Sequence, residues 1–400
     1  MVSKTNIKQF FLKLLMFLIS LVTILSSSTM YSLNNGYIIL EVILACLFIL
    51  MFLIDPLWNI TYNFLLILLL YIIIAIILCF ASNFSNYSLY TLGFLAPLCL
   101  LISNYIFCKH KVKFFLESLY VVLTAITIIS LIFWVLGSNL HLLSPNSSML
   151  VTWGDTPRQI ASYFNLYFEP QGMPIDGIIS QLNIMGLSRN SSIFIEAVIA
   201  NFFFSMGFIL SEILDKNKKY KLIYLIAIIS TFTTSGFLVA GLFILYSVIK
   251  ITPKNILIKF IKIFTYSFTI IFVIYFVFLL IANKTDTISG NTRRIKITSE
   301  LAAFLKSPIY GNGINIYTRG SSNALSAVAA DGGILLFMLY YFPLIKLTID
   351  SFIRINARLI LFVSIFFLFG ASVVQYTPFV LIAVALGWEM ILMNRTNLRS

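Results

Sequence analysis

Residues 64–81 read FLLILLLYIIIAIILCFA, a run without a single charged side chain. An α-helix needs about 20 apolar residues to cross the hydrocarbon core of a membrane, and this run approaches that length. Its apolar residues are continuous and do not alternate with polar ones, so it predicts a transmembrane helix and not a strand of a membrane barrel.

The composition of the whole chain agrees with this local pattern. Of its 400 residues, 60% are hydrophobic and only 10% are charged, whereas soluble domains are closer to half apolar and a quarter charged. So much apolar surface has to be covered by lipid, and lipid accepts only helices or closed barrels. We therefore predict an all-α polytopic membrane protein, with residues 1–400 forming a single membrane-embedded domain.

Working outward from residues 64–81, apolar runs predict about twelve transmembrane helices. The predicted helices cover residues 11–25, 38–54, 64–81, 89–107, 118–136, 191–210, 221–231, 237–249, 261–282, 324–345, 358–374 and 378–393. The pair 221–231 and 237–249 is short, with a break at residues 233–236. Short or broken helices at membrane depth are tolerated where they face protein or a wet cavity.

Basic residues indicate the orientation, because lysine and arginine gather on cytoplasmic loops. With the N-terminus inside, alternating passes place most of the 27 lysines and arginines, and both termini, in the cytoplasm. The net charge of +13 therefore follows from topology and needs no nucleic-acid partner. Two long loops then lie outside the membrane, residues 137–190 and 283–322.

Several kinds of chemistry have no signature in the sequence. The four cysteines lie in or at the ends of predicted helices without metal-ligand spacing, and the two histidines are isolated. There is no P-loop, no dinucleotide-binding fingerprint and no DxD motif. We expect no metal and no cofactor.

The first outer loop interleaves aromatic and polar side chains. The run YFNLYF at residues 163–168 lies between Arg158 and Glu169. Rings that stack on the C–H faces of sugars, beside polar groups that bind hydroxyls, are what a sugar-binding cleft needs. The alternative is an interfacial segment with its rings at headgroup depth. We take Arg158 as a candidate substrate-binding residue.

The second outer loop carries six basic residues against two acidic ones. Residues 293–305 predict an amphipathic helix suited to the membrane surface, with its apolar side chains on one face; these are Ile297, Leu301, Phe304 and Leu305. An external anion such as the phosphate of a lipid carrier explains a basic cluster on this side, since guanidinium groups bind phosphate oxygens in pairs. Anchoring to lipid headgroups is the alternative. The candidate substrate-binding residues here are Arg294, Lys296, Arg319 and Asn323.

Charged residues inside predicted helices are the other signal, because an ionisable group is costly there. Glu196 follows Arg189 by seven positions, so a helix would place both on one face, about 10 Å apart. Glu196 then acts as a general base or as the structural partner of an arginine. Asp331, followed by two glycines, is a further candidate for substrate binding. Glu41 and Glu389 lie near helix ends, where we expect them to face water.

These residues resemble motifs of bacterial O-antigen polymerases and ligases. SRNSSIFIE at residues 188–196 resembles their R-x-x-[GS]-x-F-x-E-P element, and TTSG at 233–236 resembles their S-T-x-G break. SGNTR at 289–293, followed by Pro308, GNG at 311–313, SN at 322–323 and DGG at 331–333, resembles S-G-R…P-x-x-G-x-G…H-N…G-G. The resemblance covers roughly residues 189–333.

The resemblance implies a GT-C-like glycosyltransferase in the bacterial cytoplasmic membrane, acting on glycans carried by undecaprenyl pyrophosphate. In that family the polymerase moves a growing O-antigen or capsule chain onto the next lipid-linked repeat unit, and the ligase moves a finished chain onto lipid A–core. By position Arg189 and Arg293 are the outer catalytic arginines, and Glu196 is the helix glutamate. The implied partners are the lipid-linked donor and acceptor, membrane lipid and a chain-length regulator protein.

The sequence departs from the family pattern at three positions. Ala197 stands where proline is common, Ile297 where an aromatic residue is common, and Ser322 where ligases usually have histidine. The missing histidine favours polymerase over ligase and leaves the general base unassigned.

The topology leads to the same chemistry independently. Nucleotide sugars are cytoplasmic, so an outward-facing glycosyltransferase needs a lipid-linked donor, and arginines can stabilise its pyrophosphate leaving group. A flippase for lipid-linked oligosaccharides is the main alternative. It would be expected to carry charges through a central cavity and would not need large outer loops.

Overall fold

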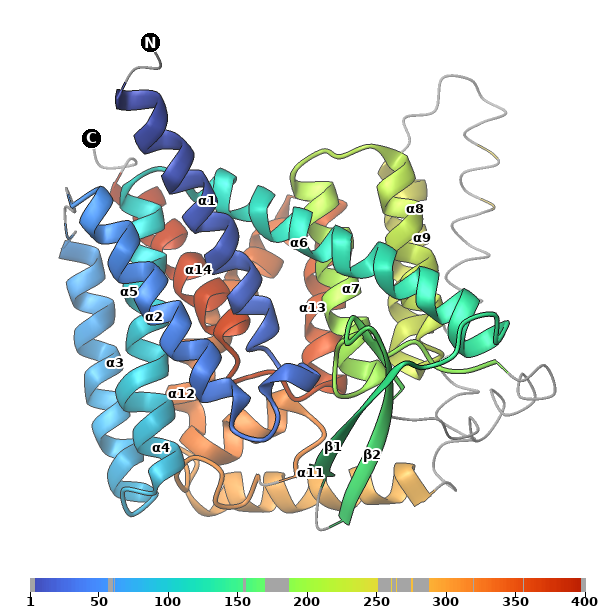
Figure 1. The fold of residues 1–400 in the computed structure, drawn as a ribbon. Coiled ribbons are helices and arrows are strands. Elements are labelled where there is room, and N and C mark those ends of the chain that lie inside the picture. The colour runs from blue at the N-terminus through green and yellow to red at the C-terminus, as the bar shows by residue number, and fades with distance from the viewer. Residues whose placement is uncertain are drawn as a thin grey trace. The chain divides into compact units, whose positions relative to one another are not determined.

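A computed structural model gives the structure of the chain and describes residues 4–56, 60, 62–153, 156–169, 187–250, 260, 264, 275, 288–318, 320–354 and 356–396. These residues are mostly helical, and six helices are long and apolar enough to cross a membrane (Figure 1). This is the structure of a helical membrane protein, as the composition predicts. The chain divides into two compact units. Unit 1 comprises Met1–Val122, Lys296–Leu344 and Val373–Ser400, and unit 2 comprises Leu123–Ile295 and Ile345–Ser372.

Unit 1 is built from membrane helices and the short turns that join them. Its elements are α1 (Lys4–Leu25), the 3-10 turn η1 (Met30–Ser32), α2 (Gly36–Ile54), α3 (Tyr62–Ala81), α4 (Asn86–Tyr90), the π-helical turn η2 (Thr91–Leu95), α5 (Ala96–Cys108) and α14 (Pro378–Thr396). Three helices have residues in both units, namely α6 (Val112–Phe133), α11 (Ile288–Lys306) and α12 (Ala324–Ile353). Within unit 1, α1 packs against α2 and α5 packs against α14.

Three lysines gather around one carboxylate at one end of unit 1. Lys8 in α1, and Lys109 and Lys111 in the turn after α5, place their Nζ atoms 3.1, 3.2 and 3.4 Å from the carboxylate of Asp55. The start of α1 and the end of α14 lie at this same end (Figure 1). These helix ends are the ones that the distribution of basic residues predicts to be cytoplasmic.

Two carboxyl groups are buried among the helices of unit 1, against our expectation that they face water. Glu41 in α2 accepts a hydrogen bond from Tyr90, and Glu389 in α14 accepts one from Asn104 Nδ2 at 2.6 Å. Both glutamates are 3% exposed. The expectation was wrong because the polar partner of each one lies on another helix, far away in the sequence.

Unit 2 combines helices with a small sheet. Its elements are the π-helical turn η3 (Trp134–Asn139), β1 (Ser147–Trp153), β2 (Thr156–Tyr163), β3 (Tyr167–Phe168), α7 (Ala197–Ile213), α8 (Lys218–Ser230), α9 (Thr234–Lys250) and α13 (Arg358–Ala371). The rings of Phe208 and Phe243 stack with centroids 4.1 Å apart and join α7 to α9. Glu212 near the end of α7 pairs with Lys221 and Lys250, at 2.7 and 2.9 Å.

The sheet corrects the all-α prediction. β1 and β2 pair antiparallel, from Ser147 opposite Ser162 to Trp153 opposite Thr156, and β3 pairs with β2. The sequence contains the signal for this hairpin, because β-branched and aromatic residues flank the dipeptide Gly154-Asp155. We interpreted the segment through its aromatic and charged residues and did not predict the two paired strands.

The predicted helices overlap the described ones, although several boundaries differ: α1 begins seven residues before the predicted start, α6 begins six before, and α12 ends eight residues after the predicted end. Two further predictions also differ. The helix predicted at residues 191–210 begins only at Ala197, and the span predicted at 261–282 lies outside the described residues except for positions 264 and 275. Twelve spans were predicted, whereas six described helices meet the length of a membrane span. Shorter apolar helices are Ala197–Ile213, Thr234–Lys250, Arg358–Ala371 and Pro378–Leu392.

Candidate functional site

The segment that leads into α7 carries two of the predicted catalytic residues, and it is not helical. Ser192 has a φ of +56°, in the left-handed region, and Glu196 is extended with φ −139° and ψ 150°. We predicted that a helix would place Arg189 and Glu196 on one face. That geometry is wrong, because a turn and an extended residue separate Arg189 from the first turn of α7.

A buried asparagine fixes this segment in place. Asn190 is fully buried, its Oδ1 accepts a hydrogen bond from Ser130 Oγ at 2.6 Å, and its Nδ2 donates to Ser230 Oγ at 2.9 Å. Ser130 belongs to α6 and Ser230 ends α8, so one side chain ties the segment to two helices. In addition, Trp134 Nε1 donates to the carbonyl of Ser188 at 2.8 Å. The residues flanking Arg189 are therefore held rigidly.

A second anchor lies on the other side of the turn. Phe194 is buried and stacks on Phe203 of α7, with ring centroids 4.5 Å apart and an interplanar angle of 6°. The N–H of Phe168 in β3 donates to the carbonyl of Ser192 at 2.9 Å. In the motif SRNSSIFIE, the residues that anchor the segment thus lie between the two charged residues, Arg189 and Glu196.

Arg189, Glu196 and Arg293 form a charge cluster within unit 2. Burial raises the pKa of the Glu196 carboxyl, while the positive charges of Arg293 and Arg189 act in the opposite direction. All three residues are half-buried. Arg293 comes from α11, far from Arg189 in the sequence, so tertiary folding brings the three charges together.

This cluster differs from the acid–lysine clusters described above in the range over which its charges act. At Asp55 and Glu212 the lysine Nζ atoms contact the carboxylate oxygens directly, at distances of 2.7–3.4 Å. Among the described residues, Arg293 and Arg189 act on the Glu196 carboxyl through their charge at longer range.

The other basic residues that we predicted to bind substrate do not form one group with this cluster. Arg294 is the exposed neighbour of Arg293, and Lys296 is half-buried one turn further along α11, in unit 1. Arg158 pairs with Val151 through the backbone of β2, and its side chain lies outside what the structure describes. Arg319 also lies outside the described residues.

Asp331 and Asn323 are held by the protein itself. The buried Asp331 carboxylate accepts hydrogen bonds from the N–H of Asn315, from Thr318 Oγ1 and from Tyr376 Oη, at 3.1, 2.7 and 2.6 Å. Asn323 caps α12, since its Oδ1 accepts from the N–H groups of Leu325 and Ser326. The structure gives both residues internal partners.

The glycines around Asp331 explain why the motif has this form. The kink in α12 occurs at Gly332 and Gly333, and the N–H of Gly313 donates to the carbonyl of Asp331 at 2.9 Å. Gly313 has a φ of +95°, and a Cβ atom there would lie 2.6 Å from the backbone nitrogen of Ser82. The P-x-x-G-x-G and D-G-G elements therefore close a loop tightly onto the kink.

The TTSG break connects α8 to α9 and is shorter than predicted. α8 ends at Ser230 and α9 begins at Thr234, so the break is residues 231–233. Thr233 caps α9, because its Oγ1 accepts from the N–H of Gly236 at 2.9 Å. Asn201 Nδ2 in α7 donates to Ser235 Oγ at 3.2 Å. The small residues therefore serve capping and close helix packing.

The aromatic run of the first outer loop is mostly internal. Tyr163, Tyr167 and Phe168 are buried, and the Tyr163 ring stacks on Phe133 of α6 at 5.8 Å. Only Phe164 is exposed among the four rings, at 63%. Tyr163 and Tyr167 pack the hairpin onto Phe133 at the end of α6. Neither the sugar-cleft interpretation nor the interfacial one assigned them this role.

α11 turns an apolar face outward, with Ile295, Leu301 and Leu305 exposed. Its covered face includes Glu300, which is fully buried and accepts a hydrogen bond from Ser326 Oγ of α12. Sequence reasoning missed Glu300, although its spacing of seven residues from Arg293 places the two on one helix face. Ile297 and Phe304, predicted on the apolar face, are half-buried.

Comparison of the chain with protein-family models, with curated proteins and with solved structures finds no match. The resemblance to O-antigen polymerases and ligases therefore rests on the motifs alone. Within the described ranges, no group of three or more histidine, cysteine, aspartate or glutamate side chains is placed to hold a metal ion.

Proposed function

We propose that this chain polymerises lipid-linked oligosaccharide repeat units on the outer face of the bacterial cytoplasmic membrane. It would transfer the growing glycan from undecaprenyl pyrophosphate to the next lipid-linked repeat, as a metal-independent glycosyltransferase. The observation that supports this most is the charge cluster of Arg189, Glu196 and Arg293. Two guanidinium groups beside one carboxylate suit a reaction that releases a pyrophosphate and removes a proton.

The proposed step divides these tasks among the three residues. The acceptor hydroxyl oxygen attacks the anomeric carbon of the donor sugar, and the bond from that carbon to the pyrophosphate oxygen breaks. Arg189 and Arg293 neutralise the negative charge that develops on the leaving pyrophosphate. The Glu196 carboxylate takes the proton of the acceptor hydroxyl, and its raised pKa makes it a stronger base than an ordinary glutamate.

The proposal includes a topology. Both termini and the lysine clusters at Asp55 and Glu212 would be cytoplasmic, and the long loops with Arg189 and Arg293 would be outside. Shorter helices and the predicted span at 261–282 would complete about twelve passes in a GT-C-like arrangement. The polyprenyl tails of donor and acceptor would leave the site sideways into the bilayer, which is the reason that such an enzyme is embedded in the membrane.

Glycan chain-length analysis in a strain lacking this protein tests the proposal against its alternatives. A single repeat unit left on the lipid or on the final acceptor is the result expected of a missing polymerase. Free polymer beside bare acceptor would indicate a ligase, and the absence of outward-facing oligosaccharide would indicate a flippase.

A further inference from the structure

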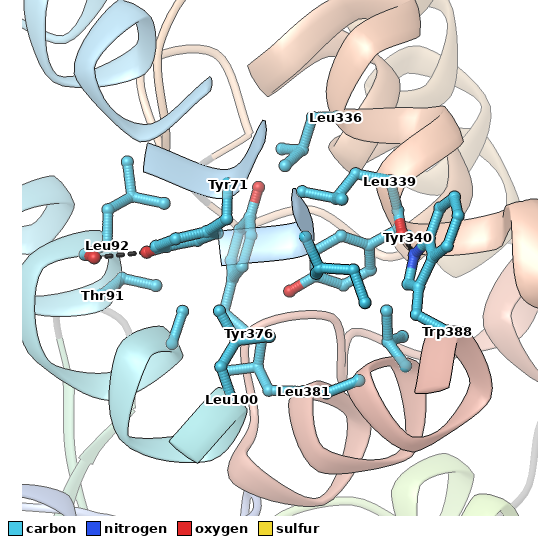
Figure 2. A pocket seen from close by; sticks show the side chains of 14 residues that line it. Tyr71, Thr91, Leu92, Leu100, Leu336, Leu339, Tyr340, Tyr376, Leu381 and Trp388 are labelled. Atoms are coloured by element: carbon cyan, nitrogen blue, oxygen red, sulfur yellow. Dashed lines mark hydrogen bonds between the residues drawn. The ribbon is translucent and has the colours of Figure 1, made fainter. Parts of the chain in front are cut away.

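A cavity of about 50 Å³ lies inside unit 1. Residues from α3, η2, α5, α12 and α14 line it, all within or beside segments of membrane-spanning character. Figure 2 shows its walls, which are the rings of Tyr71, Tyr340, Tyr376 and Trp388 together with leucine and alanine side chains. The cavity is therefore lined mainly by carbon and lies among helices that are apolar enough for a membrane.

The polar ends of the four rings are used elsewhere. Tyr71 Oη donates to the carbonyl of Leu92, as the dashed line in Figure 2 marks. Tyr340 Oη donates to the carbonyl of Gln375 at 2.7 Å, and Trp388 Nε1 donates to that of Leu339 at 2.7 Å. Tyr376 Oη is held by Asp331. Because these groups have partners, the rings offer little to a polar ligand, and an apolar cavity stays free of water.

The space itself has an identifiable origin. The π-helical turn Thr91–Leu95 forms part of the wall, and single π turns inside α-helices occur frequently at functional sites. Its Leu92 carbonyl receives the Tyr71 hydrogen bond, which stabilises the irregular turn. Ala96 and Ala385 also line the cavity, and their small side chains leave room. An irregular helix and two alanines thus maintain a void that regular packing would fill.

We propose that this cavity binds the terminal carbons of a phospholipid acyl chain. Acyl chains surround these helices at solvent concentration, so even a weak site between the helices is filled by them. The cavity is smaller than the roughly 150 Å³ apolar cavity that takes up benzene, so it fits the slim end of an unbranched chain better than a methyl-branched isoprenoid. The site is independent of the proposed glycan transfer.

The test uses the purified full-length chain in nanodiscs of phosphatidylethanolamine that carries a diazirine at the end of one acyl chain. After illumination, mass spectrometry locates the labelled residues. We expect labelling of Tyr71 and Trp388 in the wild type. Ala385→Leu fills the cavity and should abolish that labelling. Ala383→Leu adds the same side chain two residues away at an exposed position of α14 and should leave it intact.

Two further arms keep the proposal falsifiable. If Ala385→Leu does not yield folded protein, Ala96→Leu fills the same cavity from α5 and should also abolish the labelling. A photoreactive polyprenyl phosphate should label Tyr71 and Trp388 less than the phospholipid does. Labelling that persists when the cavity is filled, that is absent in the wild type, or that favours the polyprenyl probe would overturn the proposal.

Discussion

Arginine and lysine occupy different electrostatic settings in this molecule. The lysines at Asp55 and Glu212 are in direct contact with a carboxylate, whereas Arg189 and Arg293 act on Glu196 from a distance. A guanidinium group binds two oxygens in one plane, and an ammonium group does not. A site that has to hold pyrophosphate between two cations has reason to use arginine for both.

Replacing either arginine with lysine tests that reasoning. Arg189→Lys and Arg293→Lys keep the charge and lose the planar pair of donors, so each should lower polymerisation by about a hundredfold, the scale of losing one donor to a developing anion. Arg294→Lys, on the next residue of α11, and Lys306→Ala should reduce it much less. Product chain length from purified protein, with expression measured in parallel, gives the answer. A native rate for Arg293→Lys would remove this residue from the site.

The carboxyl of Glu196 makes a separate prediction about pH. Burial raises its pKa above the ordinary value of 4.5, and a general base works only when deprotonated. The rate should therefore fall as the pH drops through the raised pKa, at a higher pH than an ordinary glutamate would give. Glu196→Gln should abolish most activity and remove this acidic limb from what remains. A limb that persists unchanged in Glu196→Gln would assign the base elsewhere.

At the scale of elements, the loop over the α12 kink should tolerate no added side chain. Gly313→Ala combines a φ of +95° with a Cβ atom 2.6 Å from Ser82, so it should lower the free energy of unfolding by about 1–3 kcal/mol. Gly93→Ala is the matched control, because no atom outside its own helix lies within 4 Å of the added Cβ. Thermal unfolding in detergent measures both. Equal stability of the two variants would mean that the loop is not closed as described.

The elements also show what a sequence can and cannot predict. Membrane helices depend on local apolar runs, so α2 and α3 were predicted nearly to the residue. The turn at Ser192 depends on Asn190 reaching Ser130 and Ser230, contacts that no local pattern reveals. For the same reason the motifs identified Arg189, Glu196 and Arg293 as candidates, while the geometry that joins Arg189 to Glu196 was predicted wrongly.

At the scale of the whole molecule, the topology is the prediction on which the lipid-linked donor depends. In a variant without native cysteines, Ser148→Cys in β1 and Ser299→Cys in α11 should react with an impermeant maleimide added outside intact cells. Lys218→Cys at the start of α8 should react only after permeabilisation. All three positions are exposed, which makes them comparable. The reverse pattern would place the arginines in the cytoplasm, where nucleotide sugars are available.

The π-helical turn Thr91–Leu95 has a consequence for which deletions of residues the chain can tolerate. A π turn holds one residue more than an α turn needs, and one residue corresponds to about 100° of helix rotation. Deleting a single residue there would let the helix wind regularly, and the residues after it would keep their orientation because the wider turn had absorbed the extra residue. Asn104 would therefore still face Glu389 and donate to its carboxylate. The π turn thus lets the chain hold one residue more without changing the rotational phase of α5 relative to α14.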